Sequence, residues 1–157
     1  MKKTLSLCIA ILAILFSFVS CKTSGPEDVS ALVTKDGEPA GLVITYNKVI
    51  DKSSVSTKTY SIKGYEAGKV FASTVNPFLE EKPEGKVSYV VILLKAGDNP
   101  AESVSSDTDV IAINTTPNIS VQQVKSIKTV DGKVVPAWKE SFKATNAFPI
   151  NGGLMTK

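Results

Sequence analysis

The chain has 157 residues, and its formal charge of +3 comes from 18 lysines and no arginine set against 15 acidic residues. It contains no histidine, which excludes Ser-His-Asp and Cys-His nucleophilic sites and imidazole-ligated zinc sites within these residues. The missing arginine excludes bidentate guanidinium recognition of phosphate or guanine.

The first 21 residues have the pattern of a bacterial lipoprotein signal. Lys2 and Lys3 precede an uncharged apolar run, Leu5–Val19, which is shorter than the roughly 20 residues that a spanning helix needs. The run ends Phe18-Val19-Ser20-Cys21, which resembles a lipobox, although Phe18 stands where that motif usually has Leu. The resemblance implies cleavage before Cys21 and acylation of its sulfur and its new amine. The alternative is an ordinary signal peptide followed by a chance cysteine.

This interpretation divides the chain into a signal peptide (1–20), a lipidated Cys21 with a flexible tether (21–28) and one domain (29–157). Dual acylation gives stable membrane anchoring, and Lys22 after the cysteine favours the outer membrane of the bacterial cell envelope. Removal of Lys2 and Lys3 leaves 16 lysines against 15 acidic residues. A chain so close to neutral has no electrostatic footprint for nucleic acid.

Strand patterns dominate the expected domain. Alternation, β-branched residues and turn dipeptides such as Asp36-Gly37 and Asp131-Gly132 predict short strands. These lie at 29–34, 42–46, 58–62, 69–75, 87–94, 110–113, 133–137 and 141–144. Residues 87–94 are apolar on both faces, which is typical of a strand covered on both sides. Residues 119–130 are predicted to form one bulged strand rather than a helix. We therefore predict an all-β, immunoglobulin-like two-sheet sandwich.

One stretch carries a family resemblance. Residues 42–62, with Asp51-Lys52-Ser53-Ser54-Val55 between two strands, resemble the opening of bacterial Ig-like modules. More narrowly they resemble the Ig-like N-terminal domain of EstA-type secreted bacterial esterases, and the likeness extends through 85–94 and 131–138. Asp51 and Ser53 suit a side-chain-bonded turn, so this motif is predicted to be structural.

The resemblance implies a module that supports a hydrolase, and these residues contain no Gly-x-Ser-x-Gly elbow and no histidine. We therefore expect a non-catalytic binding or accessory module, with no cofactor and no metal. Its expected partners are the membrane, through the lipid anchor, and a protein, either a hydrolase or a second copy. A glycan ligand stays open. The alternative function is a structural envelope lipoprotein that associates with itself through an edge strand.

Several residues are candidate sites with competing interpretations. Ser61 with Lys63 and Ser141 with Lys143 could form Ser-Lys pairs, but one-sided polar strands explain them better. Asp107 and Asp109 form an oxygen-rich loop that falls short of a calcium motif. Trp138 could stack on a sugar or partner, or it could fill the core. Phe78-Leu79 could be an exposed contact or could plug the end of the sandwich. The sequons at Asn114 and Asn118 carry no information in a bacterial lipoprotein.

Overall fold

The computed structural model describes residues 25–77, 87–95 and 116–150, which form an all-β sandwich. The strands are β1 (Asp28–Val33), β2 (Pro39–Tyr46), β3 (Tyr60–Ile62), β4 (Ala67–Ser73), β5 (Ser88–Leu94), β6 (Ser120–Gln123), β7 (Ile127–Lys128), β8 (Val134–Val135), β9 (Phe142–Lys143) and β10 (Asn146–Pro149). Two short 3-10 turns, η1 (Lys52–Ser54) and η2 (Thr57–Thr59), connect β2 to β3. The all-β sandwich expected from the sequence is confirmed.

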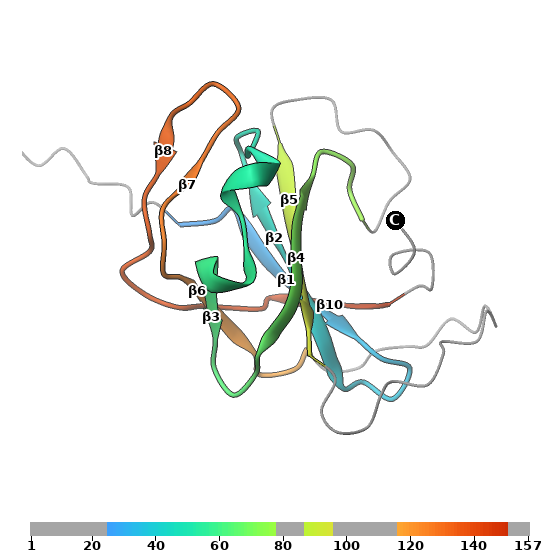
Figure 1. Ribbon diagram of the computed structural model, residues 1–157. Helices are drawn as coiled ribbons and strands as arrows, with labels where there is room; N and C mark the ends of the chain where they lie inside the picture. The colour runs from blue at the N-terminus through green and yellow to red at the C-terminus, as the bar shows by residue number, and fades with distance from the viewer. Residues whose placement is uncertain (1–24, 78–86, 96–115, 151–157) are drawn as a thin grey trace, which may run out of the picture.

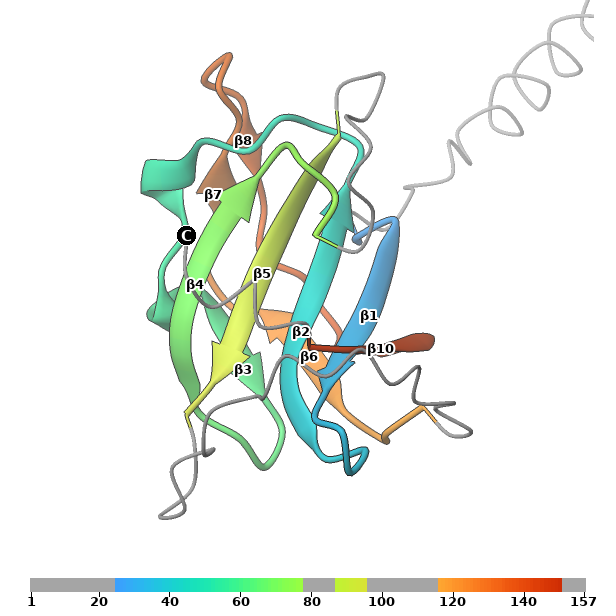
Figure 2. The ribbon, with the colours of Figure 1, turned by 90° about the vertical axis from the view of Figure 1, so that its right-hand side faces the viewer.

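The main layer is a five-stranded sheet in the order β10-β1-β2-β5-β4, seen face-on in Figure 2. Its pairs are antiparallel except β1 with β10, which run parallel. The second layer contains the three-stranded sheet β3-β6-β9 and the small β7-β8 hairpin. In Figure 1, β3, β6, β7 and β8 lie together to the left of the five-stranded sheet.

The main core lies between these layers. Every second residue of the central strands points inward, as the two-residue period of a strand requires. Its largest fully buried aliphatic side chains are Leu42, Ile44, Ile92, Ile119 and Ile127. A smaller apolar cluster occupies the opposite face of the five-stranded sheet, where Leu32, Val43 and Val91 are fully buried.

Residues 87–94 were predicted to form a strand covered on both faces, and this prediction is confirmed. Strand β5 lies between β2 and β4, and Val90, Val91 and Ile92 are fully buried although successive residues face opposite sides of the sheet. Val90 and Ile92 belong to the main core, whereas Val91 belongs to the cluster on the other face. Both faces of this strand are therefore covered, which accounts for its unbroken apolar sequence.

The single bulged strand predicted over 119–130 is wrong, although the choice of strand over helix is right. The segment forms β6 and β7, which belong to different sheets. The exposed residues 124–126 separate them, and the Gln123 side chain donates a 2.9 Å hydrogen bond to the Lys125 carbonyl within this segment. The side chain thus stabilises the change of direction that ends β6.

Three other expectations need correction. The strand predicted from Lys58 begins only at Tyr60, because the Ser56 and Thr59 side chains form a capping box around η2. Strand β10 was not predicted, since its sequence contains a proline and lacks a strand period. The turn signals in the sequence predict six to eight strands, whereas the described residues contain ten.

Several predictions fall outside the described residues. They are the lipidation site Cys21, the strand at 110–113, and the candidate residues Phe78, Leu79, Asp107, Asp109 and Asn114. Residues 25–28, the end of the predicted tether, do belong to the described residues. Glu27 donates its backbone N–H to the Thr45 carbonyl at 2.9 Å, and Asp28 begins β1.

Candidate functional site

The Asp51 turn is a structural element, as the sequence predicts. The Asp51 carboxylate accepts hydrogen bonds from the backbone N–H and the hydroxyl of Ser53, both at 2.9 Å. These bonds lower the pKa of the Asp51 carboxyl, chiefly through the backbone N–H. The turn also joins the layers, because the Asp51 N–H donates to the Lys128 carbonyl of β7 at 2.8 Å. The motif therefore holds η1 against the β7-β8 hairpin, and the Asp51 carboxylate and N–H are engaged in these structural hydrogen bonds.

The two candidate Ser-Lys pairs lie at exposed positions of the second layer. Ser61 points outward between two buried neighbours of β3, and Lys63 is exposed in the turn that follows. Ser141 and Lys143 are exposed on either side of Phe142. A lysine that activates a serine is normally desolvated to lower its pKa. These positions fit the interpretation as one-sided polar strands.

Trp138 belongs to the core, since only 4% of its surface is exposed. Its ring contacts Phe142 edge-on at a centroid distance of 5.2 Å and lies 6.1 Å from Tyr46 and 6.3 Å from Tyr60. Its indole N–H is buried and has no hydrogen-bond partner among the described residues. The possibility that Trp138 is an exposed platform for a sugar is therefore wrong.

A buried polar network lies next to this tryptophan. The Tyr46 hydroxyl donates to Gln123 Oε1 at 2.8 Å and lies 3.1 Å from the Tyr60 hydroxyl. Gln123 Nε2 lies within 3.3 Å of the carbonyls of Lys125, Val135 and Pro136. Burial raises the pKa of both tyrosines above the ordinary value of 10.0. The network links β2, β3 and β6 and stays neutral at physiological pH.

The sequence patterns did not indicate this network, although Tyr46 carries a hydroxyl in the mostly apolar strand β2. Gln123 follows the alternation of β6 as an inward-facing residue, and a buried amide requires several hydrogen-bond partners. Such a glutamine could have been singled out from its position. Its partners could not, because they come from strands far away in the sequence.

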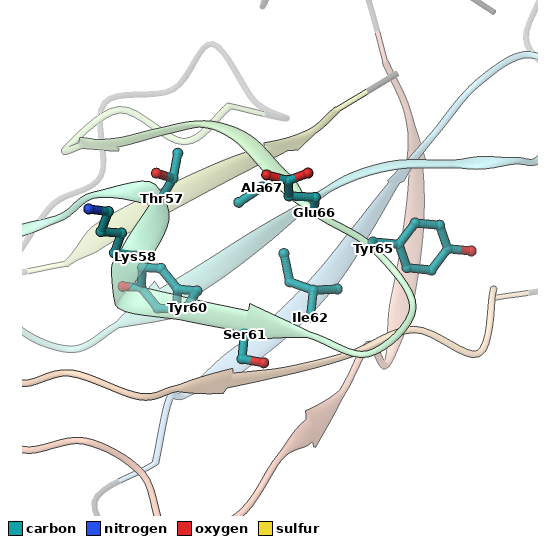
Figure 3. Close-up of a pocket in the computed structure, with 8 residues that line it drawn as sticks. All are labelled: Thr57, Lys58, Tyr60, Ser61, Ile62, Tyr65, Glu66 and Ala67. Atoms are coloured by element: carbon teal, nitrogen blue, oxygen red, sulfur yellow. The ribbon is translucent and has the colours of Figure 1, made fainter. Parts of the chain in front are cut away.

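The structure contains a shallow, open pocket of about 340 Å³ between η2 and the turn from β3 to β4. Its lining residues, shown in Figure 3, are Thr57, Lys58, Tyr60, Ser61, Ile62, Tyr65, Glu66 and Ala67. The Tyr65 ring points away from the other lining side chains (Figure 3). Glu66 forms an ion pair with Lys95. The lining offers no set of convergent catalytic groups.

Among residues 25–77, 87–95 and 116–150, no three acidic, cysteine or histidine side chains come together in a group that could hold a metal ion. In the same ranges, no helix is long and apolar enough to cross a membrane.

These features define an all-β, Ig-like module whose buried polar groups serve the fold. The chain matches the family model of the esterase Ig-like N-terminal domain over residues 31–136, more than half of its length. It belongs to that family. The match begins inside β1 and ends just after β8, so β9 and β10 lie beyond it.

A solved structure supports the same conclusion. The chain is similar to a protein described as a thermostable esterase, with a TM-score of 0.52 and 25% identity. The similarity covers 79% of this chain and only 36% of the esterase chain, so the present chain spans about a third of that protein's length. No curated protein sequence matches the chain. The family resemblance seen in the sequence is confirmed.

Proposed function

We propose that this chain is a non-catalytic accessory module, anchored to the envelope membrane through Cys21, that binds and supports a partner esterase. The observation that carries the proposal is the family match over 31–136, because that family is the domain that precedes an esterase. The candidate Ser-Lys pairs are exposed and separate, which is consistent with a role in binding rather than catalysis.

A crosslinking pull-down from intact cells that express the full chain tests the partner. We expect a hydrolase to be recovered, and we expect addition of the module to change that hydrolase's turnover of a short-chain ester. Recovery of no hydrolase, or turnover of the ester by the purified chain itself, would contradict the accessory role.

The lipid anchor is tested separately by metabolic labelling with an alkyne-tagged palmitate. Cys21→Ser should abolish labelling and release the protein from the membrane fraction. Cys8→Ser is the matched control, since it removes the other cysteine of the chain and should leave labelling unchanged. Equal labelling of both variants would rule out acylation at Cys21.

The alternative, a structural protein that associates through an edge strand, has less support. In the five-stranded sheet, η1 and η2 contact the outer strand β4, and the outer strand β10 contains Pro149, which lacks an N–H. Covered edges and prolines are features that prevent strand addition. Light scattering of the purified protein at high concentration distinguishes the two functions, because an accessory module should remain monomeric.

A further inference from the structure

We infer that the layer formed by residues 120–145, the β6–β9 layer, is the surface that faces the membrane and contacts its anionic headgroups. The inference rests on the lipid anchor of the proposed function, and it adds an orientation and a contact surface. Three independent observations support it: where the tether docks, how the charge is distributed and where exposed apolar side chains gather.

The tether docks on this layer. A Cβ on Gly25 would lie 2.6 Å from Cζ of the Phe142 ring in β9, so the backbone at Gly25 is in direct contact with that ring. Only residues 22–24 separate Gly25 from Cys21, so these two Cα atoms are at most about 14 Å apart. A lipid on Cys21 would therefore hold the surface around β9 close to the bilayer.

The fixed start of the domain restricts its rotation about this point. Glu27 and Asp28, the acidic residues next to Gly25, accept hydrogen bonds from Asn47 and Thr145, each at 2.7 Å. Both carboxylates are thus tied to the domain, one to the end of β2 and one to the segment after β9. The chain enters the domain as an ordered segment, and its direction of approach is set.

The positive charge of the described residues is concentrated on the same layer. Residues 120–145 carry five lysines and two acidic residues, all of them exposed, which gives a net charge of +3. The lysines are Lys125, Lys128, Lys133, Lys139 and Lys143. The five-stranded sheet, with the turn between β1 and β2 and with Lys95 after β5, carries three lysines and three acidic residues and is neutral. Residues 47–66, which contain η1, η2 and β3, carry four lysines and two acidic residues, a net charge of +2. The β6–β9 layer, at +3, therefore has the largest net positive charge of these three parts and complements an anionic surface best.

Exposed apolar side chains gather there as well. Val124, Val130 and Val134 have exposed fractions of 45%, 66% and 62%. Val134 pairs with Lys128 across the β7-β8 hairpin, so the two side chains share its outer face. In Figure 1, β7 and β8 lie on the side of the molecule where the chain enters β1, whereas Figure 2 shows the hairpin towards β4 and the entry point towards the opposite edge, at β1. Basic and apolar side chains on one face are typical of an interfacial contact.

A pair of labels tests the orientation on the full, lipidated chain reconstituted in vesicles containing phosphatidylglycerol. Lys139→Cys labels the β6–β9 layer, and Lys35→Cys is the matched control, because it changes another exposed lysine in the turn between β1 and β2. A Cys8→Ser background leaves the introduced cysteine as the free thiol. We expect a fluorophore at residue 139 to be quenched by headgroup-nitroxide lipids at least threefold more strongly than one at residue 35. Equal quenching, or stronger quenching at residue 35, would overturn the inference.

Charge variants test the contact itself on the mature chain, residues 21–157, carrying Cys21→Ser, so that neither the lipid nor the apolar signal run is present. Lys128→Gln with Lys139→Gln and Lys143→Gln should weaken binding to the same vesicles, by about fivefold for each lysine at low salt. The control combines Lys35→Gln, Lys69→Gln and Lys95→Gln, which change exposed lysines in or next to the five-stranded sheet and should have little effect. A similar loss of vesicle binding in both variants would overturn the inference. It would also be overturned if the chain with all its lysines did not bind the vesicles but bound an acidic protein through these same lysines.

The lipid anchor and the orientation of the domain are contradicted by different results. If palmitate labelling at Cys21 is absent, the anchor is wrong, whereas the charge variants still test the lipid contact. If labelling is present and the two fluorophores are quenched equally, the anchor stands and the orientation is wrong.

Discussion

Tyr46 and Gln123 are 77 residues apart in the sequence, and the Tyr46 hydroxyl donates a 2.8 Å hydrogen bond to Gln123 Oε1 in the core of the sandwich. The bond connects β2 of the five-stranded sheet to β6 of the second layer. Because Gln123 also donates to backbone carbonyls where β6 ends and after β8, it stabilises the boundary between the two layers.

Gln123→Leu should destabilise the protein strongly. The substitution keeps a similar volume but removes the acceptor of the Tyr46 hydroxyl bond and the donor to several carbonyls, which costs about 2–4 kcal/mol in the free energy of unfolding. Gln122→Leu is the control, since Gln122 makes one side-chain hydrogen bond, to the Trp138 carbonyl at 3.1 Å. Urea denaturation should show a much smaller loss for the control. Similar losses for the two variants would contradict the role of the network.

Trp138→Ala should cost about 3–5 kcal/mol, because it removes a large buried ring and leaves a cavity beside Phe142. Trp138→Phe should cost much less, since it keeps an aromatic ring and removes a buried donor that has no partner among the described residues. Thermal unfolding compares the two variants. A Trp138→Phe variant as unstable as Trp138→Ala would show that the indole N–H makes an important hydrogen bond.

The fluorescence of the wild-type chain gives an independent test of the same packing. The sequence contains one tryptophan, so its emission reports Trp138 alone. We expect an emission maximum shifted to the blue and weak quenching by iodide, with both features lost on unfolding. Strong iodide quenching of the native protein would contradict the burial of this side chain.

The protein should lose stability at alkaline pH. Burial raises the pKa of Tyr46 and Tyr60 in the folded state above the ordinary value of 10.0 that each has when unfolded. The contribution of these two tyrosines to the free energy of unfolding is therefore fully present below pH 10. It is lost as the pH rises above 10, because the unfolded chain then releases protons that the folded chain retains. Denaturation at pH 8 and pH 11 measures the effect. Tyr46→Phe should reduce this pH dependence, and an unchanged dependence would exclude Tyr46 as its source.

Gly41→Ala should destabilise the five-stranded sheet. An added Cβ would lie 2.5 Å from the Ile92 carbonyl oxygen, so the backbones of β2 and β5 would have to move apart, at a cost of about 1–3 kcal/mol. Gly25→Ala is the comparison, because its Cβ meets the Phe142 ring, a side chain that can shift. Chemical denaturation should give the larger loss for Gly41→Ala, and the reverse order would contradict this assignment.

Sequence alone was sufficient for the fold class, the family and the central strand. The alternation of residues 42–46 and the apolar run of 87–94 reflect the two-residue period of a strand and the burial of both its faces, which are local properties. The Asp51 turn was predictable for the same reason, since its hydrogen bonds join residues two positions apart.

Only the tertiary structure decided what depends on contacts between distant residues. It buried Trp138, paired Gln123 with Tyr46, divided residues 119–130 between two sheets and added β10 as a parallel edge strand. It also placed Gly25 against Phe142, far along the chain, and so located the start of the domain beside its most basic layer. None of these has a local period or motif, because each is set by which strands become neighbours when the two layers pack.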